Sequence, residues 1–136
     1  MSTARKVLLV DDDVLLGENI VRHELDWASV GTHKASAVRA KLLLIAPDIE
    51  ATARLLRVNG QDSPTASASV LEEISACDLI IDATANPHVF LRLAGVAQAS
   101  KTAMVWAQVY AGGFGGLVAR ARPGLDPNPL AVRDGI

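Results

Sequence analysis

The stretch from Lys6 to Lys34 constrains the fold more than any other part of this 136-residue chain. It opens with four β-prone apolar residues, Val7 to Val10, and breaks at once into three aspartates, Asp11 to Asp13. A short apolar run of this kind predicts a buried strand, and the carboxylates predict a polar site at its carboxyl end. Open α/β sheets bind their ligands at that end of the strands.

A second apolar run, Asp78 to Asp82, also ends in a carboxylate, and helical patterns separate the runs. The predicted strands are Val7–Val10, Ile49–Val58, Asp78–Asp82, Thr102–Val109 and Leu117–Ala121. The predicted helices are a short one within Gly17–Leu25, then Thr32–Ala46, Val70–Ala76 and His88–Ala99. Strands that alternate with helices predict an α/β fold, with a Rossmann-like, mostly parallel sheet and flanking helices.

Three further segments lack a clear period. Gln61 to Ser69 is rich in Ser, Thr and Ala and is predicted to be a loop, and AGGFGG (Ala111 to Gly116) is a glycine-rich loop. Arg122 to Ile136 contains three prolines and is predicted to be an extended tail or linker. The expected domain therefore covers residues 1–121 and the tail covers 122–136.

Composition excludes several classes of protein. A net charge of −2 offers no electrostatic basis for binding nucleic acid or an anionic membrane surface. The single cysteine, Cys77, excludes an intrachain disulfide and a cysteine-rich zinc site. No apolar run approaches the roughly 18 residues that span a bilayer, and no signal peptide is visible. We therefore expect a cytoplasmic protein with no nucleic-acid or membrane partner.

The start of the chain, KVLLVDDD, also fits the receiver domain of response regulators. In that class, acidic residues after the first strand bind magnesium beside a phosphoacceptor aspartate at the end of the third strand. Asp82 would be that acceptor, but it follows Asp13 at a much longer spacing than receivers have. The segment after Asp13 also lacks an amphipathic first helix, so this alternative is disfavoured.

The order of features along the chain resembles the ThiF/MoeB superfamily, the adenylating domains related to ubiquitin-activating enzymes. The matching segments run from about Lys6 to Gly124 and are VDDDVLLGENIVRH, VGTHKASAVRAKLLLIAP and CDLIIDATANPHVFLRLAGVA, followed by a strand and a glycine-rich turn. The resemblance implies an adenylyltransferase, expected to be a homodimer. Such an enzyme uses ATP and magnesium to activate the C-terminal glycine of a ubiquitin-like or sulfur-carrier protein.

The resemblance also implies roles for six residues. Those expected to hold the nucleotide are Asp11 (the ribose), Asp13 (the second acid of a D-x-D motif), Asn19 and Arg22 (the phosphates), and Lys34 (the α- and β-phosphates). Asp82 would bind magnesium. Arg22, Lys34 and Asp82 are the expected catalytic residues, because they would stabilise charge as a carboxylate attacks the α-phosphate and pyrophosphate leaves.

The chain departs from the family pattern at several points. His23 replaces the usual glutamine, and Ala85 replaces the second aspartate of D-x-T-D-N. The family's first strand, glycine-rich G-x-G-x-x-G turn and first helix would precede Lys6, so we expect a fragment that is inactive alone. Strands 7–10 and 79–82 would then pair directly or receive strand contacts from another chain. The alternative is a non-catalytic dimerisation or partner-docking module on the same scaffold.

Overall fold

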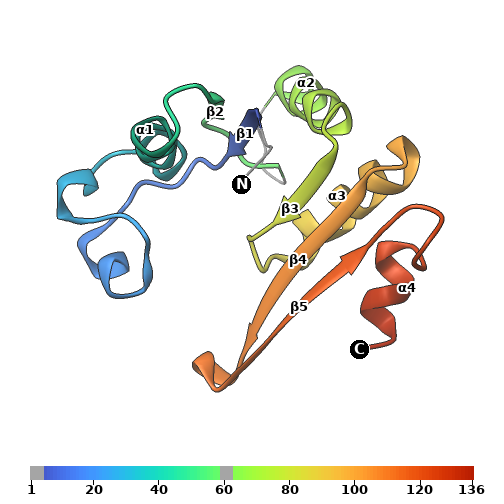
Figure 1. Ribbon diagram of the computed structural model, residues 1–136. Helices are drawn as coiled ribbons and strands as arrows, with labels where there is room; N and C mark the ends of the chain where they lie inside the picture. Colours follow the sequence, from blue (N-terminus) through green and yellow to red (C-terminus); the bar gives the residue numbers. More distant parts are fainter. Residues whose placement is uncertain (1–4, 59–62) are drawn as a thin grey trace. The chain divides into compact units, whose positions relative to one another are not determined.

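A computed structural model describes residues 5–58 and 63–136 of the chain (Figure 1). Two compact units make up the chain, Met1–Ser67 and Ala68–Ile136. Within the described residues, no helix is both long enough and apolar enough to cross a membrane.

The first unit is built on two parallel strands. β1 (Lys6–Val10) pairs with β2 (Glu50–Arg54) in a register that runs from Lys6 opposite Glu50 to Val10 opposite Arg54. The connection holds two short 3-10 helices and one α-helix: η1 (Gly17–Arg22), η2 (Trp27–Ser29) and α1 (Lys34–Ile45). α1 packs on β2. The buried apolar residues of this unit are Leu15, Leu25, Ala35 and Ala51.

Helix α2 (Pro64–Ser75) begins earlier than the sequence predicts. The predicted loop over Gln61–Ser69 is wrong from Pro64 onward, and its first two residues lie outside the described residues. The Ser63 hydroxyl accepts a hydrogen bond from Ala66 N–H at 3.2 Å, and Pro64 occupies the first helical position. A serine cap and a proline at the first position start a helix even where Ser and Thr are frequent.

The second unit is a three-stranded sheet in the order β3-β4-β5. β3 (Leu79–Asp82) runs parallel to β4 (Ala103–Tyr110), and β5 (Gly115–Ala121) returns antiparallel to β4. The tip of this hairpin is η3 (Ala111–Gly113), where Gly112 and Gly113 have positive φ angles of 68° and 107°. Glycine adopts this region without a steric penalty, so the glycine-rich segment turns sharply.

Helix α3 (Pro87–Ser100) connects β3 to β4 and covers their sheet, as predicted. Asn86 caps its first turn, since its side-chain oxygen accepts from the N–H groups of His88 and Val89 at 2.9 and 3.3 Å. The buried face of α3 consists of Val89, Phe90, Leu93, Ala94 and Ala97. It packs on a sheet face that contains Trp106 and Met104, both nearly inaccessible.

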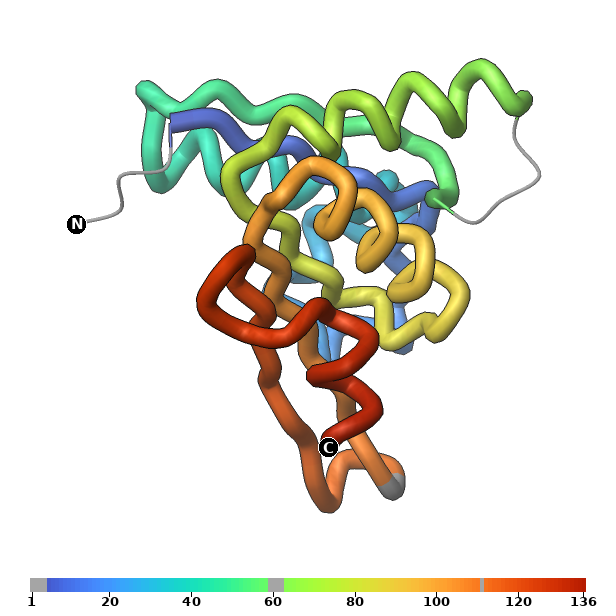
Figure 2. The backbone as a smooth tube through the Cα atoms, turned by 90° about the vertical axis from the view of Figure 1, so that its right-hand side faces the viewer, coloured from blue at the N-terminus to red at the C-terminus, as the bar shows by residue number. Residues whose placement is uncertain are grey.

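The segment after β5 is folded, which corrects the prediction of an extended tail. The Arg122 guanidinium forms two hydrogen bonds with the Asp126 carboxylate, from Nε at 2.8 Å and Nη2 at 3.1 Å. This hydrogen bonding lowers the pKa of Asp126. Helix α4 (Pro129–Asp134) follows, capped by Asn128. α4 lies beside α3 and β5, and the β4–β5 hairpin extends past both helices (Figure 2).

The α/β fold with parallel strands and flanking helices is confirmed. β1 pairs with β2 in the first unit, and β3 pairs with β4 in the second. Direct pairing of strands 7–10 and 79–82 stays a prediction. Strand contacts from another chain remain a prediction. The division into residues 1–121 and 122–136 also stays a prediction, although α4 shows that the second part is not extended.

Phe90 offers the clearest test of the packing in the second unit. Its ring meets Trp106 edge to face, with centroids 5.2 Å apart, and the Arg133 guanidinium lies 4.5 Å above it. Phe90→Ala should lower the free energy of unfolding by about 3–5 kcal/mol, because truncating a buried phenylalanine leaves a cavity. Urea unfolding followed by circular dichroism measures this loss.

Phe114→Ala is the matched control, because Phe114 is 96% exposed. It should change the free energy of unfolding by no more than about 0.5 kcal/mol. Equal losses in the two variants would contradict this packing.

Candidate functional site

The turn after β1 holds its three aspartates in three different ways. Asp11 Oδ1 accepts a hydrogen bond from Asp13 N–H at 2.8 Å, which folds that side chain back over the end of the strand. Asp12 Oδ2 pairs with Arg57 Nε at 2.8 Å. Asp13 Oδ2 pairs with Lys34 Nζ at 3.1 Å. Each aspartate offers one carboxylate oxygen, and these oxygens lie within 4.8 Å of one another.

Lys34 reaches Asp13 because two distant segments run antiparallel. Leu15 N–H donates to the Thr32 carbonyl, and Lys34 N–H donates to the Asp13 carbonyl, both at 2.8 Å. Gly31 turns the chain into this arrangement with a φ of 87°, which favours glycine. The Lys34 side chain is 20% exposed, against 55% for Asp13. The backbone therefore brings Lys34 to the end of β1, where its ammonium meets Asp13.

Asn19 and Arg22 both lie on η1. Residues three apart eclipse one another on a 3-10 helix, so the two share one side of it. Asn19 Oδ1 accepts from Leu16 N–H at 3.0 Å and thereby caps η1. Arg22 is exposed. Among residues 5–58, no hydrogen bond or ion pair joins the side chains of Asn19 or Arg22 to Asp11, Asp13 or Lys34.

Asp82 belongs to the second unit and ends β3, where it is 3% exposed. Its Oδ1 accepts from both Thr84 N–H, at 2.9 Å, and Thr84 Oγ1, at 2.7 Å. Thr84 Oγ1 in turn accepts from Asn86 N–H at 3.2 Å. The DATAN segment is thus a chain of side-chain caps that leads from β3 into α3.

Ala85 lies in this segment with a φ of 53°. The left-handed region is unfavourable for alanine and easier for aspartate or asparagine, whose side chains bond locally. The aspartate that the ThiF/MoeB pattern has here would fit this backbone better. The structure thus gives the substitution a conformational cost, independent of any catalytic role.

The donor set fits a nucleotide and a divalent cation in kind. Lys34 keeps donors beyond the one that meets Asp13, and Arg22 offers a planar fork suited to phosphate. Within the described residues, Asp82 Oδ2 has no hydrogen bond, so it can coordinate a hard cation while Oδ1 holds Thr84. Asp11, Asp13 and Lys34 lie together at one strand end, Asn19 and Arg22 share a helix, and Asp82 is in the other unit.

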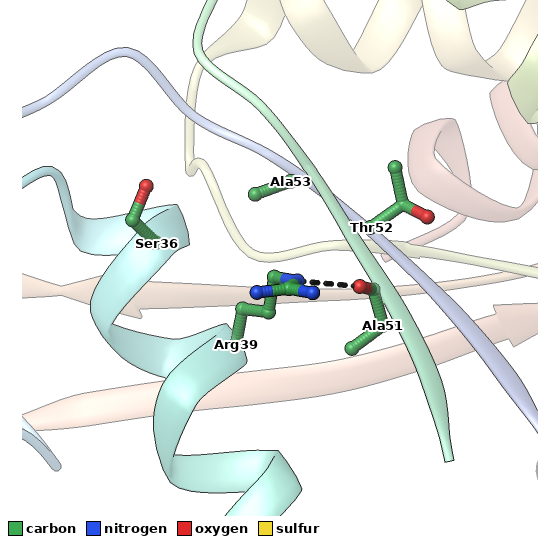
Figure 3. Close-up of a pocket in the computed structure, with 5 residues that line it drawn as sticks. All are labelled: Ser36, Arg39, Ala51, Thr52 and Ala53. Carbon is green, nitrogen blue, oxygen red and sulfur yellow. Dashed lines mark hydrogen bonds between the residues drawn. The ribbon is translucent and has the colours of Figure 1, made fainter.

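A hollow that the sequence pattern did not indicate lies between α1 and β2 (Figure 3). It has a volume of about 370 Å³ and is lined by Ser36, Arg39, Ala51, Thr52 and Ala53. Arg39 Nε donates to the Ala51 carbonyl at 2.6 Å. None of the six residues expected at the nucleotide site lines this hollow. In the sequence, only the small residues of β2 could have indicated this hollow. They do so only once the register of β2 against β1 is known.

Comparison with known proteins gives one family and a set of solved structures. The ThiF family model matches residues 2–128. No curated protein matches the chain. E. coli MccB in a structure with succinimide is similar with a TM-score of 0.73 and 15% identity, over 88% of this chain and 34% of that one.

Two further structures share the fold. E. coli MccB with ATP has a TM-score of 0.63 and 16% identity, over 76% of this chain and 30% of that one. PaaA has a TM-score of 0.61 and 19% identity, with the same coverages of 76% and 30%. The chain therefore spans about a third of the length of these proteins.

Asp82 has a structural role that any test of its chemistry must separate out. Asp82→Ala should lower the free energy of unfolding by about 1–3 kcal/mol, because it removes the acceptor for two Thr84 donors beside a buried site. Asp82→Asn keeps an oxygen in place of Oδ1 and should lose clearly less. Chemical unfolding of both variants measures the difference.

Asp78→Ala is the control, since Asp78 is exposed and lies just before β3, at the end opposite to Asp82. It should be nearly neutral. If Asp82→Asn were as destabilising as Asp82→Ala, the capping role of Oδ1 would be wrong.

Proposed function

This chain belongs to the ThiF family, and from that premise we propose that it forms part of an adenylating enzyme that uses ATP and magnesium. The observation that carries the proposal is the family match over residues 2–128, nearly the whole chain. The shared fold with MccB, one of whose structures contains ATP, supports it. The acidic turn with Lys34 beside it is the part of the first unit that suits a nucleotide.

In the proposed site, Asp11 accepts hydrogen bonds from the ribose hydroxyls through the oxygen that Asp13 N–H leaves unused. Lys34, Asn19 and Arg22 bind the phosphates and hold them in line for displacement. Asp82 would hold magnesium, with Oδ2 as the oxygen available to it. Magnesium, when bound, neutralises phosphate charge and orients the leaving group.

The proposed reaction joins a carboxylate to the nucleotide. A carboxylate oxygen attacks the α-phosphorus, the bond from that phosphorus to the bridging oxygen of the β-phosphate breaks, and pyrophosphate leaves with the electron pair. Arg22 and Lys34 stabilise the charge that gathers on the phosphate oxygens. The substrate we propose is the C-terminal glycine of a ubiquitin-like or sulfur-carrier protein, activated by a homodimeric cytoplasmic enzyme.

A non-catalytic docking module is the second candidate. Several expected site groups already have partners in the chain: Asp11 and Asn19 cap local turns, and Asp13 neutralises Lys34. The sequence also contains no G-x-G-x-x-G turn to cradle phosphates. A docking module of this kind would bind no nucleotide, so nucleotide binding separates the two candidates.

Lys34→Ala tests nucleotide binding by the chain itself. Isothermal titration calorimetry with ATP and magnesium should show affinity about tenfold to a hundredfold weaker than for the unmodified chain, because a charge-assisted contact to phosphate is lost. Lys41→Ala is the matched control, since Lys41 also lies on α1 but pairs with Glu24, at 2.7 Å. Absence of any ATP binding, or equal loss in both variants, would reject the nucleotide site.

ATP–pyrophosphate exchange tests the reaction. We expect no exchange from the chain alone, because no glycine-rich phosphate turn is present in its sequence. In a longer protein that contains this chain and such a turn, Asp82→Asn should reduce exchange about a hundredfold, and Asp78→Asn should leave it unchanged. Equal exchange by the Asp82→Asn variant and the unmodified protein would remove Asp82 from the proposed site.

A further inference from the structure

The outer edge of β2 carries backbone groups that no neighbouring strand uses. Glu50 N–H donates to the Arg5 carbonyl at 2.9 Å, and the Arg54 carbonyl accepts from Asp11 N–H at 3.1 Å. The backbone N–H and C=O groups of the even-numbered residues of β2 are therefore directed toward β1. Alternation along a parallel strand turns the N–H and C=O groups of Ala51 and Ala53 to the other side. Among the described residues, β1 is the only strand that pairs with β2.

One of these four outward groups is occupied. Arg39 reaches from α1 and its Nε donates to the Ala51 carbonyl at 2.6 Å (Figure 3). In residues 5–58 and 63–136, the Ala51 N–H and both backbone groups of Ala53 have no hydrogen-bond partner. Unpaired groups along a strand edge are a template for another strand.

The sequence of β2 is complementary to that of a second β2 strand that runs in the opposite direction. The strand reads EATAR, with an acid at one end, a base at the other and Thr52 in the middle. We propose that β2 pairs antiparallel with β2 of a second copy of this chain, about a twofold axis at Thr52. Ala51 then faces the partner's Ala53, and the four outward groups of each strand bond across the seam.

The charged ends select this register. Glu50 faces the partner's Arg54, and Arg54 faces the partner's Glu50, so the twofold axis produces two equivalent cross-strand ion pairs. A slip of the register would separate these charges. Glu50 also meets Lys6 at 3.6 Å and Arg54 is engaged within its own chain, so both contacts would be shared or exchanged.

The side chains of β2 leave the seam accessible. In Figure 3, Ala51 and Ala53 point toward α1 and Thr52 points away from it. The side chains of Glu50 and Arg54 lie on the same face of the sheet as that of Thr52, because side chains two residues apart share a face. The ion pairs therefore form on the face away from α1. Arg39 lies on the α1 side and must release the Ala51 carbonyl, so it competes with pairing.

Other occupants fit less well. If β1 paired antiparallel with β1 of a second copy, Lys6 would lie opposite the partner's Val10. No ion pair would then favour one register of the KVLLV strands over another. An extended segment of a different protein could use the same backbone groups, but the matched acid and base at the two ends of EATAR favour a second copy. The pairing requires neither nucleotide nor catalysis.

Sedimentation equilibrium of the full chain over a concentration series tests the proposal. The unmodified chain should show a monomer–dimer equilibrium. Ala53→Pro should abolish the dimer, because it removes an outward N–H from each copy while leaving the β1 ladder intact. Circular dichroism and urea unfolding confirm that this variant folds.

Charge reversal supplies variants that leave the backbone unchanged. Glu50→Arg should weaken the dimer about tenfold, since the symmetry places two like-charged pairs across the seam. Glu50→Arg combined with Arg54→Glu should restore it. Arg39→Ala should strengthen the dimer several-fold by freeing the Ala51 carbonyl.

Three outcomes would overturn the proposal. The first is a chain that stays monomeric up to its solubility limit, including one that pairs only with an extended peptide of another protein. The second is a dimer that Ala53→Pro leaves unchanged, which would place the interface elsewhere. The third is failure of the double charge swap to restore the association that Glu50→Arg loses.

Discussion

A strand in a parallel pair turns alternate backbone groups toward its neighbour and the rest away, and both sheets of this chain depend on that constraint. In the first unit it ties Glu50 and Arg54 to β1 and sends Ala51 and Ala53 outward. In the second unit it aligns the carboxyl end of β3 with β4, so that Asp82 lies opposite Trp106. Strand direction therefore decides both where the acidic residues gather and where the edges stay open.

The acidic residues at the strand ends share one local device. Asp11 accepts from the backbone N–H two residues ahead, and Asp82 does the same with Thr84. Each carboxylate thereby fixes the turn that follows its strand with one oxygen and keeps the other for a second partner. A structural role and a ligand role are compatible in such a residue. Replacement by alanine removes both roles at once, so a loss of function would not distinguish them. Replacement by asparagine keeps the acceptor oxygen that fixes the turn and removes only the negative charge.

Local pattern predicted the elements whose signals are local. The apolar runs predicted β1 and β3, and the helical pattern over His88–Ala99 predicted α3, because these signals involve only neighbouring residues. Helix α4 was not predicted, although its cap residue Asn128 and the proline that follows it are a local signal. Prolines alone indicate extended chain, but Pro129 after Asn128 opens a helix.

The candidate site shows the same division. The resemblance to the ThiF/MoeB superfamily implied a common site for Asp11, Asp13 and Lys34. The contact of Lys34 with Asp13 depends on the Gly31 turn and on the bridge between Val14 and His33. No local period encodes a bridge between segments so far apart. Arg39 had no signal at all, because its hydrogen bond to Ala51 needs α1 laid across β2. The charge pattern of EATAR is visible in the sequence, and only the strand register gives it a meaning.

The ion pair between Asp13 and Lys34 bears on how such a site could work. With Lys34 20% and Asp13 55% exposed, the pair is partly screened by solvent, and pairs of this kind contribute only about 0–1 kcal/mol. A contact of that strength orients the ammonium at the end of β1 without holding it there. Phosphate oxygens carry more charge than one carboxylate and can take over the contact at small cost. If the proposed function holds, Asp13 positions Lys34 before a nucleotide binds, whereas a fully buried pair would oppose the exchange.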